Sequence, residues 1–296
     1  MECGTELNTL LPFSSLAGSP RSRVRPTRSA VMEPVSPVPN AIPRMESYTL
    51  RSGFLPDDRT ISVYLPPSYA TEPTRRFPVF YLHDGQNLFD PRTSYVPGRT
   101  WRAGETADRM AEAGEAQPII LVGVANTGLR RMAEYTPTRD FRMGGGEGAL
   151  YGRLLIEELK PFLDRTYRTL AGPSDTGLAG SSLGGLITLY LGLQYPHIFG
   201  KLGVLSPSTW WDHRSILTFV KDGFKEPPPK IWLDIGTAEG QRHLRDTQLL
   251  ERVLIQSGWT PGQNLAFHIV EGAVHDEDAW AERFNKVLAF LFPVVA

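Results

Sequence analysis

The chain has 296 residues, of which 41% are hydrophobic and 21% charged, and its formal net charge is −1. This composition is typical of a soluble globular protein, and a near-zero charge argues against a nucleic-acid partner, which needs a basic surface. No apolar run approaches the length that spans a bilayer, so we expect no membrane segment. The single cysteine, Cys3, excludes an internal disulfide and fits a reducing, cytoplasmic location.

Residues 1–44 are rich in proline, serine and arginine and show no hydrophobic periodicity. The weakly apolar "LLPFSSLAG" precedes the arginines and is broken by Pro12, which argues against a secretory signal. Three glutamates argue against a transit peptide. We therefore expect a disordered N-terminal extension over 1–44 and one folded domain over 45–296.

Regular patterns begin after residue 46. Two alternating stretches predict half-buried antiparallel strands at 47–52 and 59–69. Apolar runs that suit buried parallel strands follow at 77–85, 118–124, 176–180, 201–206, 230–236 and 265–270. Between them, helical periodicity predicts helices over 149–167, 182–196, 241–258 and 276–292.

Strands that alternate with helices indicate an α/β fold. We expect a mostly parallel twisted sheet with helices on both faces and antiparallel strands leading in.

The motif G-x-S-x-G occurs as Gly180-Ser181-Ser182-Leu183-Gly184. In a chain with 28 glycines the pattern alone is weak evidence. Its context strengthens it, because Ser182 lies between a short strand and an apolar helix, as the serine of a nucleophile elbow does. The alternative is a tight turn whose glycines serve packing alone. We predict that Ser182 is a nucleophile.

A serine nucleophile needs a base and an orienting acid, which follow it in the order acid, then histidine, in α/β-hydrolases. His275 lies in the loop after the last strand and is the expected base, whereas His268 lies within that strand. For the acid, Glu239 in the loop after strand 230–236 is favoured over Asp234 inside the strand. The loop position allows a carboxylate to reach the imidazole.

Two backbone N–H groups would form the oxyanion hole. One belongs to Leu183, directly after the nucleophile, and the other to Gln86, in the loop after strand 77–85. His83 and Asp84 of that loop are expected to shape it rather than to bind a metal. No pair of histidines has the spacing of an HExxH zinc site, so we expect neither metal nor cofactor.

Six stretches occur together in the order seen in one known family. They are "YLHDGQNLFD", "GVANTGLRRMAEYTP", "GSSLGGLITLY", "SPSTWW", "DIGTAEG" and "VEGAVHDEDAWAERF". Over residues 47–293 the chain resembles the putative-esterase family of α/β-hydrolases, which includes esterase D, enterochelin-type siderophore esterases, feruloyl esterases and mycolyltransferases. The resemblance implies Ser182 as nucleophile, His275 as base and Glu239 as acid, although some siderophore esterases use a Ser–His dyad.

Three further residues are candidates for substrate contact. Trp210 and Trp211 follow strand 201–206 and could form a pocket wall or a packed hydrophobic cap. Arg131 lies beyond strand 118–124 and could contact substrate or lock its loop through a salt bridge, which is the favoured alternative.

The sequence thus predicts a cofactor-independent serine esterase acting on a small-molecule ester, of siderophore or feruloyl type. The alternatives are an acyltransferase on the same triad and a catalytically silent binding protein of the same fold. Specificity depends on loop shape, so the sequence does not name the acyl or alcohol group, and it carries no signal for the oligomeric state.

Overall fold

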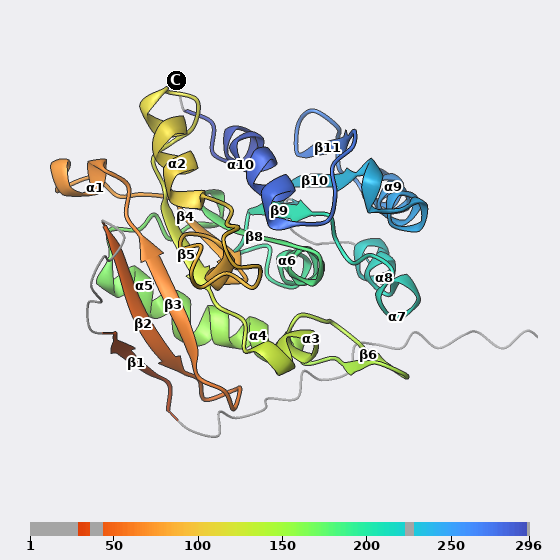
Figure 1. The fold of residues 1–296 in the computed structure, drawn as a ribbon, viewed down its shortest axis with the longest axis horizontal. Helices are drawn as coiled ribbons and strands as arrows, with labels where there is room; N and C mark the ends of the chain where they lie inside the picture. The colour runs from red at the N-terminus through yellow and green to blue at the C-terminus, as the bar shows by residue number, and fades with distance from the viewer. Residues whose placement is uncertain (1–28, 36–43, 223–227, 295–296) are drawn as a thin grey trace, which may run out of the picture.

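The computed structural model describes residues 29–35, 44–222 and 228–294 (Figure 1). Nine strands form one sheet in the order β1-β2-β3-β5-β4-β8-β9-β10-β11. The strands are β1 (Val31–Pro34), β2 (Met45–Arg51), β3 (Arg59–Tyr64), β4 (Val79–His83), β5 (Ile120–Val124), β8 (Thr176–Ser181), β9 (Lys201–Leu205), β10 (Lys230–Gly236) and β11 (Leu265–Val270). The first three strands pair antiparallel, β3 also runs antiparallel to β5, and the six strands from β5 to β11 pair parallel. The predicted α/β-hydrolase sheet with antiparallel lead-in strands is confirmed.

The helices cover both faces of this sheet. They are α1 (Ser68–Thr71), α2 (Ala103–Glu112), α3 (Arg131–Glu134), α4 (Gly148–Arg153), α5 (Lys160–Thr166), α6 (Leu183–Gln194), α7 (Trp211–Arg214), α8 (Ile216–Lys221), α9 (Gln241–Gln256) and α10 (Glu277–Leu291). One hydrophobic cluster packs α4, α5, α6, α8 and α9 against the sheet, and a second packs α2 and α10 against the other face (Figure 1). None of the helices in the described ranges is long and apolar enough to cross a membrane.

The predicted helix 149–167 is continuous but contains an irregular turn. A π-helical segment, Leu154–Leu159, joins α4 to α5, and Pro161 is the second residue after it. Proline has no N–H for the helix ladder, and its ring clashes with the carbonyl four residues earlier. A wider turn before the proline accommodates both defects, so the helix continues.

The strand β1 falls within the stretch that the sequence assigned to a disordered extension. Val31–Pro34 pair with Tyr48–Arg51 of β2, and Arg51 forms a 3.1 Å ion pair with Glu33. The extension therefore adds an edge strand, a feature that its composition does not signal. The remainder of the predicted extension, residues 1–28 and 36–43, lies outside the described residues.

Candidate active site

Ser182 sits at a sharp turn between β8 and α6, in the middle of the sheet. Its backbone has φ 59° and ψ −121°, a region that side chains other than glycine rarely occupy. The turn is possible because its flanks are small: a Cβ on Gly180 would lie 2.8 Å from the backbone of Gly184. Strain of this kind persists only where the surroundings enforce it, and it is common at functional sites.

His275 and Glu239 come together at the same edge of the sheet. The Nδ1 atom of His275 lies 2.6 Å from Oε2 of Glu239. The Glu239 side chain is fully buried, whereas that of His275 is 37% exposed. Burial alone would raise the pKa of Glu239, but hydrogen bonds from His275, Ser206 and the backbone N–H of Gly236 outweigh it and lower the pKa. Glu239 is therefore held as a carboxylate that can orient the imidazole.

A buried polar network supports Glu239 from behind. The hydroxyl of Ser206 donates to Oε1 of Glu239 at 2.7 Å and accepts from Trp280 Nε1 at 3.1 Å and from Arg283 at 3.0 Å. Trp280 also packs edge-on against the imidazole of His275, with ring centroids 4.9 Å apart. The network fixes both the carboxylate and the face of the imidazole, as the outer partners of a preorganised site do.

Asp234, the alternative acid, belongs to this network but does not contact His275. Its carboxylate accepts from Trp232 Nε1 at 2.8 Å and from the backbone N–H of Ser206 at 3.2 Å, and it lies 3.3 Å from Arg283. Burial raises the pKa of Asp234 to about 6, although the Arg283 charge opposes the shift. The geometry therefore favours Glu239 over Asp234 as the partner of His275.

The loop after β4 carries Gln86 to the edge of the same cavity. Asp84 turns the chain with φ 55°, and Gly85 starts a short 3-10 helix, Gly85–Asn87 (η1). A Cβ on Gly85 would lie 2.5 Å from the carbonyl carbon of Gly123, so only glycine lets this loop pack on β5. Gln86 and Leu183 both lie at the start of helices, where the first N–H groups have no partner within the helix. Both amides are thus available for an oxyanion.

Arg131 forms a two-pronged ion pair with Asp84. Its Nε and Nη2 atoms lie 2.7 Å from the two carboxylate oxygens, and Asn126 donates to the same carboxylate at 2.7 Å. The favoured interpretation of Arg131 as a loop lock agrees with this contact. The neighbouring His83 is fully buried beside Tyr151, and burial lowers its pKa to about 3, so it stays neutral.

Ser182, His275, Gln86 and Arg131 all line one cavity of about 710 Å³, which we call the catalytic cavity. Its outer wall includes Tyr95 and Leu129, two strongly exposed hydrophobic side chains. Among the described residues, the side chain within hydrogen-bond distance of Ser182 Oγ is that of Ser208, at 3.4 Å. A hydrogen bond from Ser182 to His275 therefore requires a rotation of the serine hydroxyl, and such bonds often form only with substrate present.

The two tryptophans have different environments. Trp211 is fully buried, and its Nε1 donates to the carbonyl of Thr138 at 3.0 Å. Of the two alternatives for Trp211, a pocket wall and a packed hydrophobic position, the structure shows the packed one, because its ring lies inside the core. Trp210 is half-buried and lines a second cavity, described below.

Ser206, Ser208, Trp280 and Arg283 surround the site but were not predicted from the sequence. Only the loop position of Ser206 and Ser208, at the carboxyl end of β9, could have suggested them. Within the described residues, no group of three or more His, Cys, Asp or Glu side chains could hold a metal ion.

Comparison with known proteins gives a consistent picture. The family described as "Putative esterase" matches residues 52–291. The "Uncharacterized protein YbbA" of Bacillus subtilis is 29% identical over 79% of this chain and 93% of its own length. An "Endo-1,4-beta-xylanase/feruloyl esterase" of Xylanibacter ruminicola is 27% identical over 79% of this chain but only 29% of its own length. The "Ferri-bacillibactin esterase BesA" of Bacillus subtilis is 26% identical over 54% of this chain and 58% of its own length.

Among solved structures, the BES protein from Bacillus cereus superposes with a TM-score of 0.71. It is 23% identical, and the match covers 88% of this chain and 99% of that protein. At this identity the likeness concerns the fold alone.

Proposed function

Since the chain belongs to the Putative esterase family, we propose that it is a serine hydrolase that cleaves small-molecule carboxylic esters through an acyl-enzyme. The observation that carries the proposal is the 2.6 Å contact between His275 and buried Glu239, beside a serine with the backbone of a nucleophile elbow. This pairing of a base with an orienting acid is what a serine hydroxyl needs to become a nucleophile.

The reaction follows from these roles. The Ser182 hydroxyl turns from Ser208 toward His275 and attacks the ester carbonyl, while Nε2 of His275 takes its proton. The N–H groups of Leu183 and Gln86 donate to the oxyanion of the tetrahedral intermediate. His275 then protonates the departing alcohol, and the acyl group remains on Ser182. Water, deprotonated by His275, releases the acid and restores the serine.

Glu239 orients the imidazole and stabilises its charged form throughout this cycle. Since Nδ1 of His275 faces the carboxylate, that nitrogen carries the N–H, and Nε2 is free to accept the serine proton. The low pKa of Glu239 supports this role, because a protonated acid could not accept from Nδ1. No step needs a cofactor.

The names of the relatives suggest candidate substrates. Two of them are described as a feruloyl esterase and a ferri-bacillibactin esterase. We propose that the substrate is an ester of feruloyl or siderophore type. The catalytic cavity of about 710 Å³ has the size of a small-molecule binding site. The single cysteine of the chain supports a reducing location such as the cytoplasm.

The test is hydrolysis of p-nitrophenyl esters from acetate to octanoate by the wild-type protein and the Ser182→Ala variant. We expect turnover that the variant loses, with a chain-length preference that reflects the cavity. Turnover that persists in the variant would overturn the proposal. Added alcohol acceptors, with analysis of the products, separate hydrolysis from acyl transfer.

A further inference from the structure

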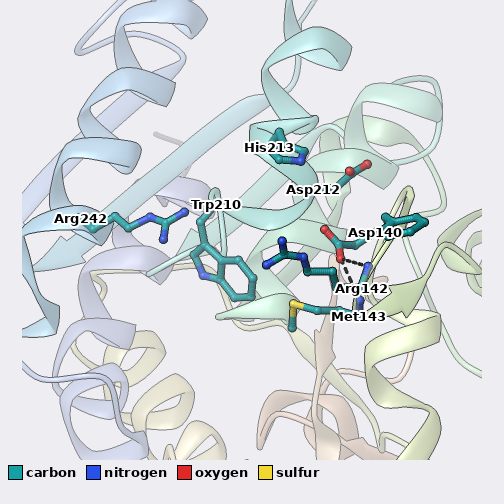
Figure 2. Close-up of a pocket in the computed structure, with 8 residues that line it drawn as sticks. Asp140, Arg142, Met143, Trp210, Asp212, His213 and Arg242 are labelled. Atoms are coloured by element: carbon teal, nitrogen blue, oxygen red, sulfur yellow. Dashed lines mark hydrogen bonds between the residues drawn. The ribbon is translucent and has the colours of Figure 1, made fainter.

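A second cavity, of about 550 Å³, lies beside the active site and has no role in the mechanism above. We call it the Trp210 pocket (Figure 2). Three segments form its walls: the hairpin of β6 (Arg139–Asp140) and β7 (Gly144–Gly145), the loop and helix α7 after β9, and the first turn of α9. The lining side chains used below are those of Arg142, Met143, Trp210, His213 and Arg242.

Two contacts tie the Trp210 pocket to the catalytic residues. Ser208, two residues before Trp210, lies 3.4 Å from the hydroxyl of Ser182. On the other wall, His243 follows Arg242 directly, and its ring centroid lies 6.4 Å from that of His275. The Cα atoms of Ser208 and Trp210, two residues apart, are at most about 7 Å apart, so the pocket lies close to the nucleophile.

The strand order separates the two cavities only in part, because the β6–β7 hairpin of the Trp210 pocket follows β5 in the chain, whereas its Trp210 and Arg242 walls do not. Ser182 follows β8, and much of the catalytic cavity is built by the loops after β4 and β5, on one side of β8. Trp210 follows β9 and Arg242 follows β10, on the other side of β8. An ester bound at Ser182 has two halves, and this arrangement offers a separate cavity to each.

The side chains around Trp210 combine positive charge with apolar surface. In Figure 2 the guanidinium groups of Arg142 and Arg242 point toward Trp210 from opposite sides. Arg242 is 71% exposed, and its Nε lies 3.9 Å from Oδ2 of Asp246, whose Oδ1 pairs with Arg214 at 2.8 Å. No ion pair of Arg142 is found among the residues described.

Two acidic side chains also line the pocket, and the charge of Asp140 interacts with those of Arg142 and His213. What matters for a ligand is where the carboxylates point relative to Trp210. The Asp140 carboxylate accepts the backbone N–H groups of Arg142 and Met143, both at 2.8 Å. The carboxylate of Asp212 points away from Trp210 (Figure 2). Both arginines can therefore donate to a ligand that lies against the indole ring.

The wall formed by α7 is strained. Asp212, His213 and Arg214 have φ values of 40°, 54° and 66°, so three consecutive residues adopt the left-handed conformation. Each such residue is costly for an L-amino acid. Strained segments of this kind cluster at ligand sites, and here the strained turn brings His213 to the cavity.

We propose that the Trp210 pocket binds a planar anionic group, an aromatic carboxylate, carried by one half of the ester. The ring stacks on Trp210 beside Met143, and the carboxylate accepts from Arg142 and Arg242. This inference rests on the proposed esterase function and adds a substrate class to it. The acyl half and the alcohol half are the two sources of the group, and the experiment separates them.

The experiment compares kcat/KM for two pairs of esters. In the acyl pair, p-nitrophenyl 3-phenylpropanoate is compared with its 4-carboxyphenyl analogue. In the alcohol pair, 2-phenylethyl acetate is compared with its ring 4-carboxylate analogue. Each carboxylate lies far from the ester carbon, so intrinsic reactivity changes little within a pair.

The proteins are the wild type, the double variant Arg142→Gln/Arg242→Gln, and the control Arg252→Gln. Arg252 is exposed on the same helix as Arg242, ten residues further along and thus about 15 Å away. We expect the wild type to prefer the carboxylated member of one pair by roughly tenfold. The preference should fall to near one in the double variant and persist in the control. The pair that responds identifies the half of the ester that enters the pocket.

A wild-type ratio near one in both pairs, or a preference that survives the double variant, would overturn the proposal. Failure of the proposed function has a different signature, namely no Ser182-dependent turnover of either neutral ester. In that case calorimetric binding of 4-(2-hydroxyethyl)benzoate decides, with 2-phenylethanol, which has no carboxylate, as the reference. Binding tighter than that of 2-phenylethanol, lost in the double variant, supports the pocket, and equal binding overturns it.

Discussion

Replacement of Glu239 by glutamine removes one charge and keeps the size of the side chain. The amide oxygen of glutamine can still accept from the Gly236 N–H and the Ser206 hydroxyl, each 2.7 Å from Oε1. Its NH₂ group then faces Nδ1 of His275, where Oε2 stands at 2.6 Å. Two donors cannot share that contact, so the imidazole must carry its proton on Nε2. In this tautomer it cannot accept the proton of Ser182, and we expect kcat to fall on the order of 10²- to 10⁴-fold.

The assay is hydrolysis of p-nitrophenyl acetate by the Glu239→Gln variant, with its Tm measured in parallel. The matched control is Asp234→Asn, a second buried acid that touches Trp232 and Arg283 but not His275. We expect kcat of the control to remain within about tenfold of wild type, since the base stays oriented. If Asp234→Asn lost more activity than Glu239→Gln, the assignment of the acid would be refuted.

Three further predictions concern the supporting structure. Gly85→Ala should lower kcat and Tm, because a Cβ 2.5 Å from the Gly123 carbonyl carbon displaces the Gln86 loop. Such overpacking lowers the free energy of unfolding by about 1–3 kcal/mol. Unchanged activity would show that Gln86 N–H has no role. Burial raises the pKa of Asp234 to about 6, against about 3.9 in an unfolded chain, so its contribution to stability is full below pH 4 and declines as the pH rises to 6. Between pH 4 and 7 the free energy of unfolding of Asp234→Asn, measured with a chemical denaturant, should therefore rise relative to that of the wild type by roughly 2 kcal/mol, and a constant difference would contradict the raised pKa. Deletion of residues 1–44 removes β1, which lies at the edge of the sheet and pairs only with β2. We therefore expect an unchanged kcat and, by calorimetry, a Tm loss of only a few degrees. Lost activity would mean that the extension contributes to the site.

The sequence predicted the sheet, and it predicted that Ser182, His275 and Glu239 lie in loops at one edge of it, because both depend on local patterns in a fixed order. Apolar runs identify the parallel strands, and G-x-S-x-G between a strand and a helix marks Ser182. His275 and Glu239 follow from their loop positions after β11 and β10. The choice between Glu239 and Asp234 could also be made from position, because a residue inside a strand is committed to the packing of that strand.

Other features depend on contacts between distant segments and have no local signal. Ser206 contacts both Glu239 and Arg283, and Arg283 is 77 residues from Ser206 in the sequence. The network is therefore visible only in the folded chain. Trp210 and Trp211 are neighbours in the sequence, but α7 begins at Trp211, and only the ring of Trp211 is buried in the core. Helix α2 was not among the predicted helices, although its sequence has a helical pattern. Ala103, Ala107 and Met110 repeat at helical spacing and are buried. Its small side chains make that signal weak.

The central claim is that Ser182, activated by His275, is the nucleophile. It is tested most directly by fluorophosphonate labelling, followed by mass mapping of the modified peptide, in wild type, Ser182→Ala and His275→Ala. The account predicts a single label on Ser182 in the wild type, none in Ser182→Ala, and labelling of His275→Ala slowed on the order of 10⁴-fold or more. Label on another residue, or equally rapid labelling without His275, would contradict it.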